Sequence, residues 1–527
     1  MSSPRPRRTP GVSLDVLSAL VGASPTPPTP PTSMAGSVVV TGVTLDSRTV
    51  RPGDLYAALP GLATHGAVFA ASARDRGAVA VLTDLAGALL LREADVDLPV
   101  LLVEQPRAVL GDLAAQVYGR PTEALALVGI TGTNGKTTTA YLVESGLRHL
   151  GGSIGLIGTV ETRIGTDRLP SARTTPEAPD LHAIFALMRE AGTSVAVMEV
   201  SSHALAQHRV DGAVFDVALF TNLSQDHLDY HHDMEHYFAA KAGLFTPAHS
   251  RRGVVCVDDE WGRRLAGTAA VPVTTLATHP GDAADWHVHG LDGPDFSLHG
   301  PDVVLALSCH LPGDFNVTNT AMAAVTLITL GHDPAAVQEA MAQEPAVPGR
   351  MERVRATTPS DSDPLAVVDY AHTPDAVGAA LRALRPTTAG RLVVVLGAGG
   401  DRDRGKRPAM GAAAAQWADD VFITDDNPRT EVPATIRGQV EEGARAVLSS
   451  HVGRAPTVAN LERRALAIAA AVARAREGES PSGNTVLVLG KGHESGQDIG
   501  GTIHPFDDRD ALRAALDGTP YRPEDPA

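Results

Sequence analysis

The sequence lacks several features or has little of them, and each shortage excludes a class of protein. Only two cysteines, Cys256 and Cys309, occur in 527 residues, which excludes a disulfide framework and a thiolate metal cluster. No apolar run approaches the roughly 18 residues of a membrane span. The formal net charge of −17 argues against a general binder of nucleic acid or anionic membranes. We therefore expect a cytoplasmic protein without a nucleic-acid partner.

Lysine is also scarce. Of 44 basic residues only four are lysines, and the other 40 are arginines; the four are Lys136, Lys241, Lys406 and Lys491. A bias this strong suggests that lysines free to become arginine are absent, so the remaining four are candidates for functions that need a compact amine. Chance survival is the alternative, and it is weakened because all four lie inside the motifs described below.

The chain is organised around residues 124–139, ALALVGITGTNGKTTT. The apolar start predicts a buried parallel strand, the glycines that follow predict a tight loop, and residues 139–150 read as an amphipathic helix. A strand, a Gly-rich loop, Lys-Thr and a helix together form an arrangement that binds phosphates, with Lys136 on the outer phosphates and Thr137 on Mg²⁺. The glycine spacing differs from the common pattern because Ile130 stands where a glycine is usual, and an ordinary Gly-rich turn is the alternative.

A chain of this length is too long for one core, and we predict three α/β domains. The first spans residues 1–122 and contains a Pro/Thr tract at 24–32, with residues 1–35 expected to be partly disordered. The second spans residues 123–347 and is predicted to be a P-loop ATP-binding domain with a largely parallel sheet. The third spans residues 348–527 and is predicted to be a doubly wound, Rossmann-like domain that binds ligands beyond the carboxyl ends of its strands.

Apolar segments alternate with helical stretches in the two larger domains. Strands are expected at 124–130, 194–200, 215–223 and 253–259 in the second domain, and at 365–370, 391–397, 420–426 and 485–492 in the third. Residues 296–311 look like an antiparallel appendage, and residues 316–330 read as a long apolar helix. Near the N-terminus, Ser13 is expected to cap a short helix.

Three polar residues of the second domain follow or neighbour predicted strands. Glu199 ends one buried strand, His227 follows the next, and Lys241 lies in a helix after that. Each one taken singly is better read as a hydrogen-bonded or solvated side chain. Because the carboxyl ends of parallel strands share one rim, their common placement instead predicts a site for a nucleotide and its metal ion. Asp46, Ser47 and Arg48 form a weaker cluster that alone reads as a solvated loop.

The motifs together resemble those of the Mur ligases of bacterial cell-wall synthesis. The segments that carry this resemblance are GTNGKTT (132–138), EVSSHAL (199–205), TNLSQDHLDYH (221–231) and the segment around Lys241. In the third domain, DNPR (426–429) looks like the motif of the diaminopimelate-adding members, and GAGGDRDRGKRP (397–408) and GKGHE (490–494) match the same members. The resemblance runs from TLDSR (44–48) to the end of the chain.

The resemblance implies an ATP-dependent amide ligase of peptidoglycan biosynthesis. ATP would phosphorylate the D-Glu γ-carboxylate of UDP-N-acetylmuramoyl-L-Ala-D-Glu, and the amine of diaminopimelate would attack the acyl phosphate. Such phosphoryl transfer needs positioning and charge neutralisation more than covalent help. The implied partners are these small-molecule substrates, and a monomer without a membrane span is expected.

The resemblance also implies site residues. ATP would be bound by Gly132, Thr133, Asn134, Gly135, Lys136, Thr137 and Thr138, with Asn319, Arg350 and Asp369 closing on it. One Mg²⁺ would be held by Thr137 and Glu199, and a second by His227 and Lys241, the last as N6-carboxylysine, a CO₂-derived carbamate. Lys136, Glu199, His227 and Lys241 would be the catalytic set. The UDP-linked dipeptide would contact Ser47, Thr174, Thr175, Ser201, Gln207 and Arg209. Diaminopimelate would contact Arg402, Asp426, Asn427, Pro428, Arg429, Gly490 and Glu494.

Other classes remain open from the sequence. A P-loop kinase or GTPase would lack a second doubly wound domain that carries amino-acid motifs. Folylpolyglutamate synthetases share the P-loop and the carbamylated lysine but lack DNPR. A non-enzymatic scaffold is disfavoured because Lys136, Glu199, His227 and Lys241 are all present. Whether the preferred isomer of diaminopimelate is meso or LL is left open, because both isomers present the distal carboxylate.

Overall fold

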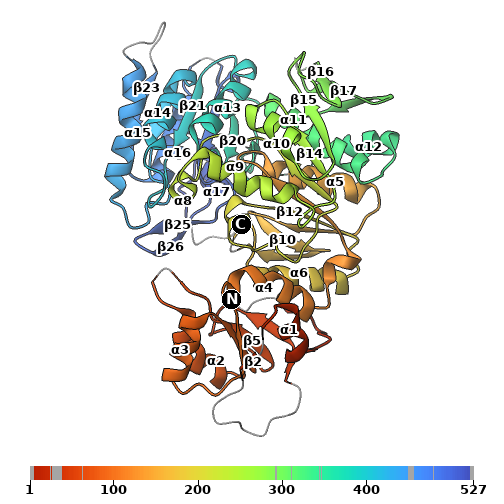
Figure 1. The fold of residues 1–527 in the computed structure, drawn as a ribbon. Helices are drawn as coiled ribbons and strands as arrows, with labels where there is room; N and C mark the ends of the chain where they lie inside the picture. Colours follow the sequence, from red (N-terminus) through yellow and green to blue (C-terminus); the bar gives the residue numbers. More distant parts are fainter. Residues whose placement is uncertain are drawn as a thin grey trace.

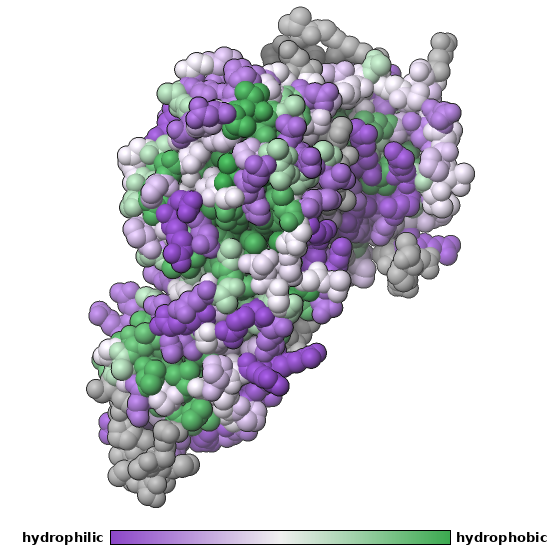
Figure 2. All heavy atoms as spheres, turned by 90° about the vertical axis from the view of Figure 1, so that its right-hand side faces the viewer, coloured by the Kyte–Doolittle hydropathy of each residue, from purple (hydrophilic) through white to green (hydrophobic). Residues whose placement is uncertain are grey.

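The chain folds into three α/β units, which the computed structural model places as one lobe below and two side by side above it (Figure 1). The structure describes residues 5–23, 25–26, 38–61, 63–171, 173–290, 293–309, 311–343, 345, 347–448, 456–478 and 480–522. A turned view shows the N-terminal unit as a lobe that projects from the body formed by the other two (Figure 2). No helix within the described residues is long and apolar enough to cross a membrane.

The first unit is built on a five-stranded sheet in the order β2-β7-β6-β5-β4. The strands are β2 (Pro25–Thr26), β4 (Gly42–Thr44), β5 (Asp54–Ala57), β6 (Ala80–Thr83) and β7 (Val100–Leu102), and the helices include α1 (Leu14–Leu20), α2 (Ala70–Asp75), α3 (Leu85–Glu93) and α4 (Pro106–Val117). Ser13 caps α1 as predicted, accepting a hydrogen bond from Val16 N. Within the Pro/Thr tract, Pro25–Thr26 pairs antiparallel with β7, and the rest of the tract lies outside the described residues.

The second unit contains an eleven-stranded sheet in the order β11-β10-β9-β12-β8-β13-β14-β15-β16-β17-β18. The strands are β8 (Ala126–Thr131), β9 (Ile154–Ile157), β10 (Glu161–Ile164), β11 (Asp167–Pro170), β12 (Val195–Glu199), β13 (Val217–Phe220), β14 (Gly253–Cys256), β15 (Val273–Ala277), β16 (Trp286–His289), β17 (Asp295–Gly300) and β18 (Val303–Ser308). From β9 to β16 all neighbours are parallel, and the predicted appendage is confirmed as the antiparallel pair β17–β18.

Helices cover both faces of the second sheet. They are α5 (Lys136–His149), α6 (Ala178–Glu190), α7 (Ser202–Ala206), α8 (Leu228–His231), α9 (Met234–Ala242), α10 (Glu260–Thr268), α11 (Asp314–Thr329) and α12 (Pro334–Met341). One apolar core joins α5 and α11 to the sheet, and a second core joins α6 and α9 to its other face. The strands between these cores are apolar on both faces, which is why their sequences read as nearly continuous apolar runs.

The third unit has a six-stranded sheet in the order β19-β20-β24-β21-β22-β23, parallel except for β19. The strands are β19 (Glu352–Val354), β20 (Leu365–Asp369), β21 (Leu392–Leu396), β22 (Asp420–Ile423), β23 (Thr457–Asn460) and β24 (Thr485–Leu489). One face is covered by α13 (Pro374–Leu384), α14 (Lys406–Trp417) and α15 (Pro433–Leu448), and the other by α16 (Arg464–Ala475) and α17 (Asp508–Leu516). A hairpin of β25 (Gly496–Ile499) and β26 (Thr502–Pro505) is added. The predicted α/β class with parallel sheets is therefore confirmed.

Candidate active site

The loop that is predicted to bind phosphates, residues 132–135, is called the phosphate loop below. It joins β8, which lies in the middle of the parallel sheet, to the N-terminus of α5. Gly132 has φ 144°, and a Cβ there would collide with Thr221 Oγ1, so the turn requires glycine. The Lys136 ammonium folds over the loop and donates to the carbonyls of Gly132 (3.0 Å) and Thr133 (2.9 Å). The loop is held from β13 by Asn222, which accepts from the Asn134 amide at 2.9 Å. A helix N-terminus and an ammonium group thus converge where an anion would bind.

Glu199 brings the first carboxylate to this loop from the end of β12, the neighbour of β8. Its Oε2 accepts from the hydroxyls of Thr137 at 2.9 Å and Thr159 at 3.0 Å, and its Oε1 accepts from the Thr159 amide at 2.7 Å. Arg350 of the third unit donates to Thr137 Oγ1 at 3.0 Å. Hydroxyl and carboxylate oxygens are the ligands that Mg²⁺ prefers, so the Thr137–Glu199 pair fits the predicted metal ion.

Lys241 and His227 lie on the other side of the phosphate loop. The Lys241 ammonium is buried, donates to Gly132 O at 2.8 Å and lies 4.6 Å from the ring centroid of Tyr237. Burial and the nearby Lys136 charge hold the pKa of Lys241 well below its ordinary value. His227 follows β13 in a left-handed conformation with φ 55°, and burial lowers its pKa to about 3. Its imidazole is therefore neutral at pH 7, which is the form that binds metal ions.

Asp226 connects this site to the third unit. Its carboxylate lies 3.6 Å from Lys406 Nζ at the start of α14, 3.9 Å from His372 Nε2 and 3.5 Å from His227 Nε2. Burial opposes ionisation, but the charges of these three groups hold the pKa of Asp226 below its ordinary value. Sequence reasoning did not single out Asp226, although the residue stands in a quoted motif beside His227.

Two further predicted ATP residues take different positions. Asn319 on α11 lies against the phosphate loop and accepts from the Thr139 hydroxyl at 3.2 Å. Asp369, at the end of β20, accepts the backbone amides of Met351 and Ala371, both at 2.8 Å. Because both Asp369 oxygens accept backbone amides, this carboxylate fixes the segment beside Arg350. Arg350 in turn contacts Thr137 of α5.

Four of the predicted dipeptide residues form one hydrogen-bonded group beside Glu199. Thr175 Oγ1 donates to Glu199 O at 2.9 Å and accepts from Ser201 N at 3.0 Å. Arg209 donates to Thr175 O at 3.2 Å and to Gln207 Oε1 at 2.6 Å. The structure therefore brings these residues together at the carboxyl end of β12.

The remaining dipeptide residues lie at the borders of this group. Thr174 Oγ1 is 3.0 Å from Thr159 Oγ1, which links it to the Glu199 carboxylate. Ser47 lies apart, in the loop between β4 and β5 of the first unit. The first unit approaches the group through Arg107 on α4, which pairs with Glu177 at 2.9 Å, and Glu177 also pairs with Arg209 at 3.1 Å. Neither Arg107 nor Glu177 carries a sequence motif that would have identified it.

The predicted amino-acid residues all lie beyond the carboxyl ends of three adjacent parallel strands. Arg402 follows β21, the DNPR segment with Asp426, Asn427, Pro428 and Arg429 follows β22, and Gly490 and Glu494 follow β24. Arg429 has φ 49° and donates to Gly400 O at 2.6 Å. Gly490 has φ 113°, and a Cβ there would collide with Asp426 Oδ2. This is the edge at which open parallel sheets bind ligands.

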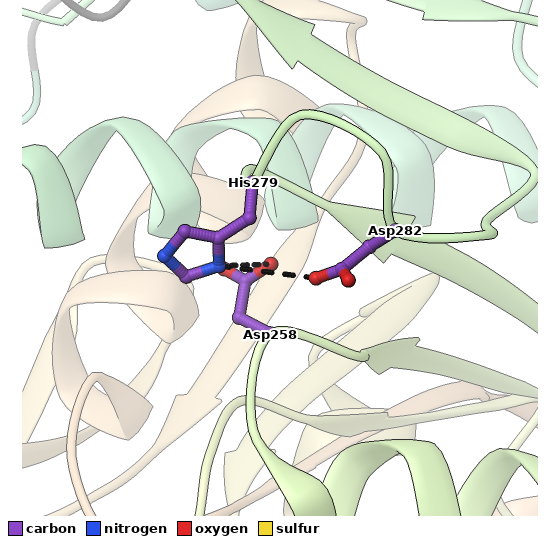
Figure 3. Close-up of side chains that lie close together, drawn as sticks. All are labelled: Asp258, His279 and Asp282. Atoms are coloured by element: carbon purple, nitrogen blue, oxygen red, sulfur yellow. Dashed lines mark ion pairs between the residues drawn. The ribbon is translucent and has the colours of Figure 1, made fainter.

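A separate group of ionisable side chains lies beyond β14 and β15 in the sheet of the second unit (Figure 3). His279 Nδ1 points between Asp258 and Asp282, at 3.6 and 4.0 Å from their carboxylate oxygens. Both Asp258 oxygens already accept from Thr278, whose amide and hydroxyl lie at 2.8 and 2.6 Å. We therefore assign this cluster to the anchoring of the loop after β15.

Three sequence profiles match the chain in order. "Mur ligase family, catalytic domain" matches residues 39–118, "Mur ligase middle domain" matches residues 130–327, and "Mur ligase, glutamate ligase domain" matches residues 349–516. Together these profiles cover most of the chain.

Individual proteins agree with the profiles. The UDP-N-acetylmuramoyl-L-alanyl-D-glutamate--2,6-diaminopimelate ligase of Streptomyces coelicolor is 55% identical over 489 residues, 92% of this chain and 94% of that protein. A solved structure of a ligase with the same name is 30% identical, has a TM-score of 0.62 and covers 96% of this chain and 99% of its own. The Mycobacterium tuberculosis folylpolyglutamate synthase, solved with ADP and AMPPCP, shares the fold at 20% identity and a TM-score of 0.57, covering 73% of this chain and 92% of its own. The chain therefore belongs to the Mur ligase family.

Proposed function

We propose that this chain is an ATP-dependent ligase that joins diaminopimelate to the D-Glu γ-carboxylate of UDP-N-acetylmuramoyl-L-Ala-D-Glu in peptidoglycan biosynthesis. One observation carries the proposal: the phosphate loop of the second unit and the DNPR edge of the third belong to facing rims. Two contacts join those rims. Arg350 donates to Thr137 Oγ1 at 3.0 Å, and Lys406 Nζ lies 3.6 Å from the Asp226 carboxylate. A relative named for this reaction and 55% identical over nearly the whole chain supports the same substrates.

The residues of the second unit would carry the first half-reaction. Lys136 and the N-terminus of α5 would bind and orient the ATP phosphates. Thr137 and Glu199 would hold one Mg²⁺, and His227 with carbamylated Lys241 would hold a second. When bound, Mg²⁺ neutralises charge on the transferring phosphoryl group. Thr175, Ser201 and Arg209 place the γ-carboxylate of the dipeptide beside the ATP, so the acyl phosphate forms without covalent help from the protein.

The third unit would then supply the amine. Arg429 binds the distal carboxylate of diaminopimelate in a bidentate pair, and Glu494 accepts its distal ammonium. The attacking amine at the other end of the substrate lies toward the second unit. Attack on the acyl phosphate forms the amide bond and releases inorganic phosphate, and ADP leaves from the phosphate loop.

Lys241 completes the proposed site as a carbamate. Only a neutral amine reacts with CO₂, and burial lowers the pKa of Lys241, which raises the fraction of the neutral form. Carbamylation turns a buried cation into a carboxylate-like ligand for Mg²⁺ beside His227. We further propose that the enzyme acts as a monomer in the cytoplasm.

Coupled nucleotide turnover tests the proposed function. ADP release should require both the UDP-linked dipeptide and diaminopimelate, and the product should be the UDP-linked tripeptide by mass. ADP release that is indifferent to the UDP-linked acceptor would instead indicate a kinase or a simple ATPase.

A further inference from the structure

Lys491 is completely buried in the third unit and all three of its ammonium protons have acceptors. Its side-chain exposed fraction is 0%. Its Nζ donates to Asn427 Oδ1 (3.2 Å), to Glu494 Oε2 (3.1 Å) and to the carbonyl of Gly496 (2.6 Å). An ammonium group has three donors and no acceptor, so this environment satisfies it completely.

The first partner, Asn427, is fixed in orientation by these contacts. Its Oδ1 accepts from Lys491 and from the Asp498 amide at 3.0 Å, and its Nδ2 donates to Glu494 Oε2 at 2.7 Å. A flipped side chain would direct its NH₂ group at the ammonium and at the Asp498 amide, which are both donors. Lys491 therefore selects one of the two amide orientations.

The second partner, Glu494, is fixed on one side only. Its Oε2 accepts from both Asn427 and Lys491, whereas its Oε1 accepts a long hydrogen bond from the Tyr370 hydroxyl, at 3.4 Å. One oxygen is held by the protein and the other is left to accept a further donor. A substrate ammonium is such a donor.

We infer that Lys491 is a positioning residue for the amino-acid substrate: it locks Asn427 and Glu494 so that Glu494 Oε1 faces the ammonium of the incoming amino acid. This inference rests on the proposed function and adds a residue to it. It also explains why a lysine remains here in a chain that otherwise uses arginine, because a planar guanidinium cannot place one donor on each of three converging acceptors.

The variant Lys491→Met tests the inference through steady-state kinetics. We expect the KM for diaminopimelate to rise roughly 10- to 100-fold, as expected for loss of charge-assisted hydrogen bonds, while the KM values for ATP and the UDP-linked dipeptide change less than about twofold. The ratio of kcat/KM for diaminopimelate over L-lysine should stay constant, because both amino acids present the ammonium. In a Glu494→Gln background the same substitution should add little.

The controls separate positioning from general stability. Arg385→Met removes an ion pair with Asp419, 2.7 Å long, at the opposite edge of the same sheet, and should lower Tm without a selective change in the KM for diaminopimelate. Lys491→Gln keeps two of the three donors in an uncharged NH₂ group, so it should fold and show a smaller rise. Parallel changes in all three KM values, or an unchanged KM for diaminopimelate, would overturn the inference. Wild-type enzyme that fails to use diaminopimelate would instead overturn the proposed function.

Discussion

At the scale of single residues, the four lysines share a chemical setting that arginine cannot reproduce. The buried Lys241 and Lys491 and the half-buried Lys136 each donate to backbone carbonyls. Lys406 approaches Asp226 between two units. The scarcity of lysine in the sequence predicted a function for all four positions. In the structure each ammonium lies close to oxygen atoms of specific residues.

The first prediction concerns charge at the phosphate loop. Lys136→Arg keeps the positive charge, but the loop carbonyls are arranged around a compact ammonium. The larger, planar guanidinium of arginine should therefore displace the phosphates. Turnover should fall about 100-fold or more, measured as ADP release. Arg148→Lys on the exposed side of α5 is the matched control and should keep normal activity; near-normal turnover in Lys136→Arg would refute the phosphate-loop assignment.

The second prediction concerns the carbamate. Lys241→Ala should lose activity and regain part of it with added short carboxylates, which occupy the space of the missing ligand. Protonation removes the amine form that reacts with CO₂, so in the wild type lowering the pH should reduce activity, and bicarbonate should partly restore it. Intact native mass should show one CO₂ on Lys241. An unmodified Lys241 together with no carboxylate rescue would contradict carbamylation.

At the scale of elements, the parallel strands and the antiparallel edge β17–β18 of the second sheet could be predicted, whereas its other edge, β10–β11, could not. Strands such as β8, β12 and β24 are buried on both faces, so their sequences are nearly uniform apolar runs. The hairpin β10–β11 mixes Glu161, Arg163 and Arg168 with apolar residues, because these side chains pair with one another and with Tyr141. Composition alone gave no strand there, and Thr159 beside the hairpin was missed with it.

The site was predictable only where a motif marks it. Glu199 and His227 end up on one rim because the carboxyl ends of β12 and β13 flank that of β8, as parallel topology requires. The contacts of Asp226 with Lys406 and His372 depend on how two units meet. Nothing local in the sequence fixes that arrangement.

The third prediction concerns the backbone of the phosphate loop. Gly132→Ala combines φ 144° with a collision against Thr221, so the loop must distort and ATP affinity should fall at least about tenfold. Gly192→Ala is the control, since it has φ 73° but nothing within 4 Å of a Cβ. It should cost about 1–2 kcal/mol of unfolding free energy without changing ATP affinity in a titration. Equal ATP affinity in both variants would contradict the loop geometry.

At the scale of the whole molecule, the second and third units meet across the site while the first projects as a separate lobe (Figures 1 and 2). The fourth prediction is that ligands draw the units together, because the proposed dipeptide site includes Ser47 in the first unit and Thr175 in the second. Small-angle scattering should show a smaller radius of gyration with an ATP analogue and the UDP-linked dipeptide together. An unchanged radius at saturating ligand would contradict closure.

The DNPR edge of the third unit gives the proposed selectivity a physical basis. Arg429 stands at the substrate edge with its guanidinium near Gly400. Lysine lacks the distal carboxylate, so it would leave this cation without its partner, a penalty worth several powers of ten in selectivity. Arg429→Ala should therefore weaken use of diaminopimelate far more than binding of ATP or the UDP-linked dipeptide.

The most direct test is a substrate panel with purified wild-type enzyme. ATP and UDP-N-acetylmuramoyl-L-Ala-D-Glu are supplied with either diaminopimelate or L-lysine, and the UDP-linked product is identified by mass while kcat/KM is measured. The predicted result is an amide product with diaminopimelate at a kcat/KM far above that for lysine, and loss of this preference in Arg429→Ala. Equal use of lysine by the wild type, or ADP release without amide product, would contradict the account.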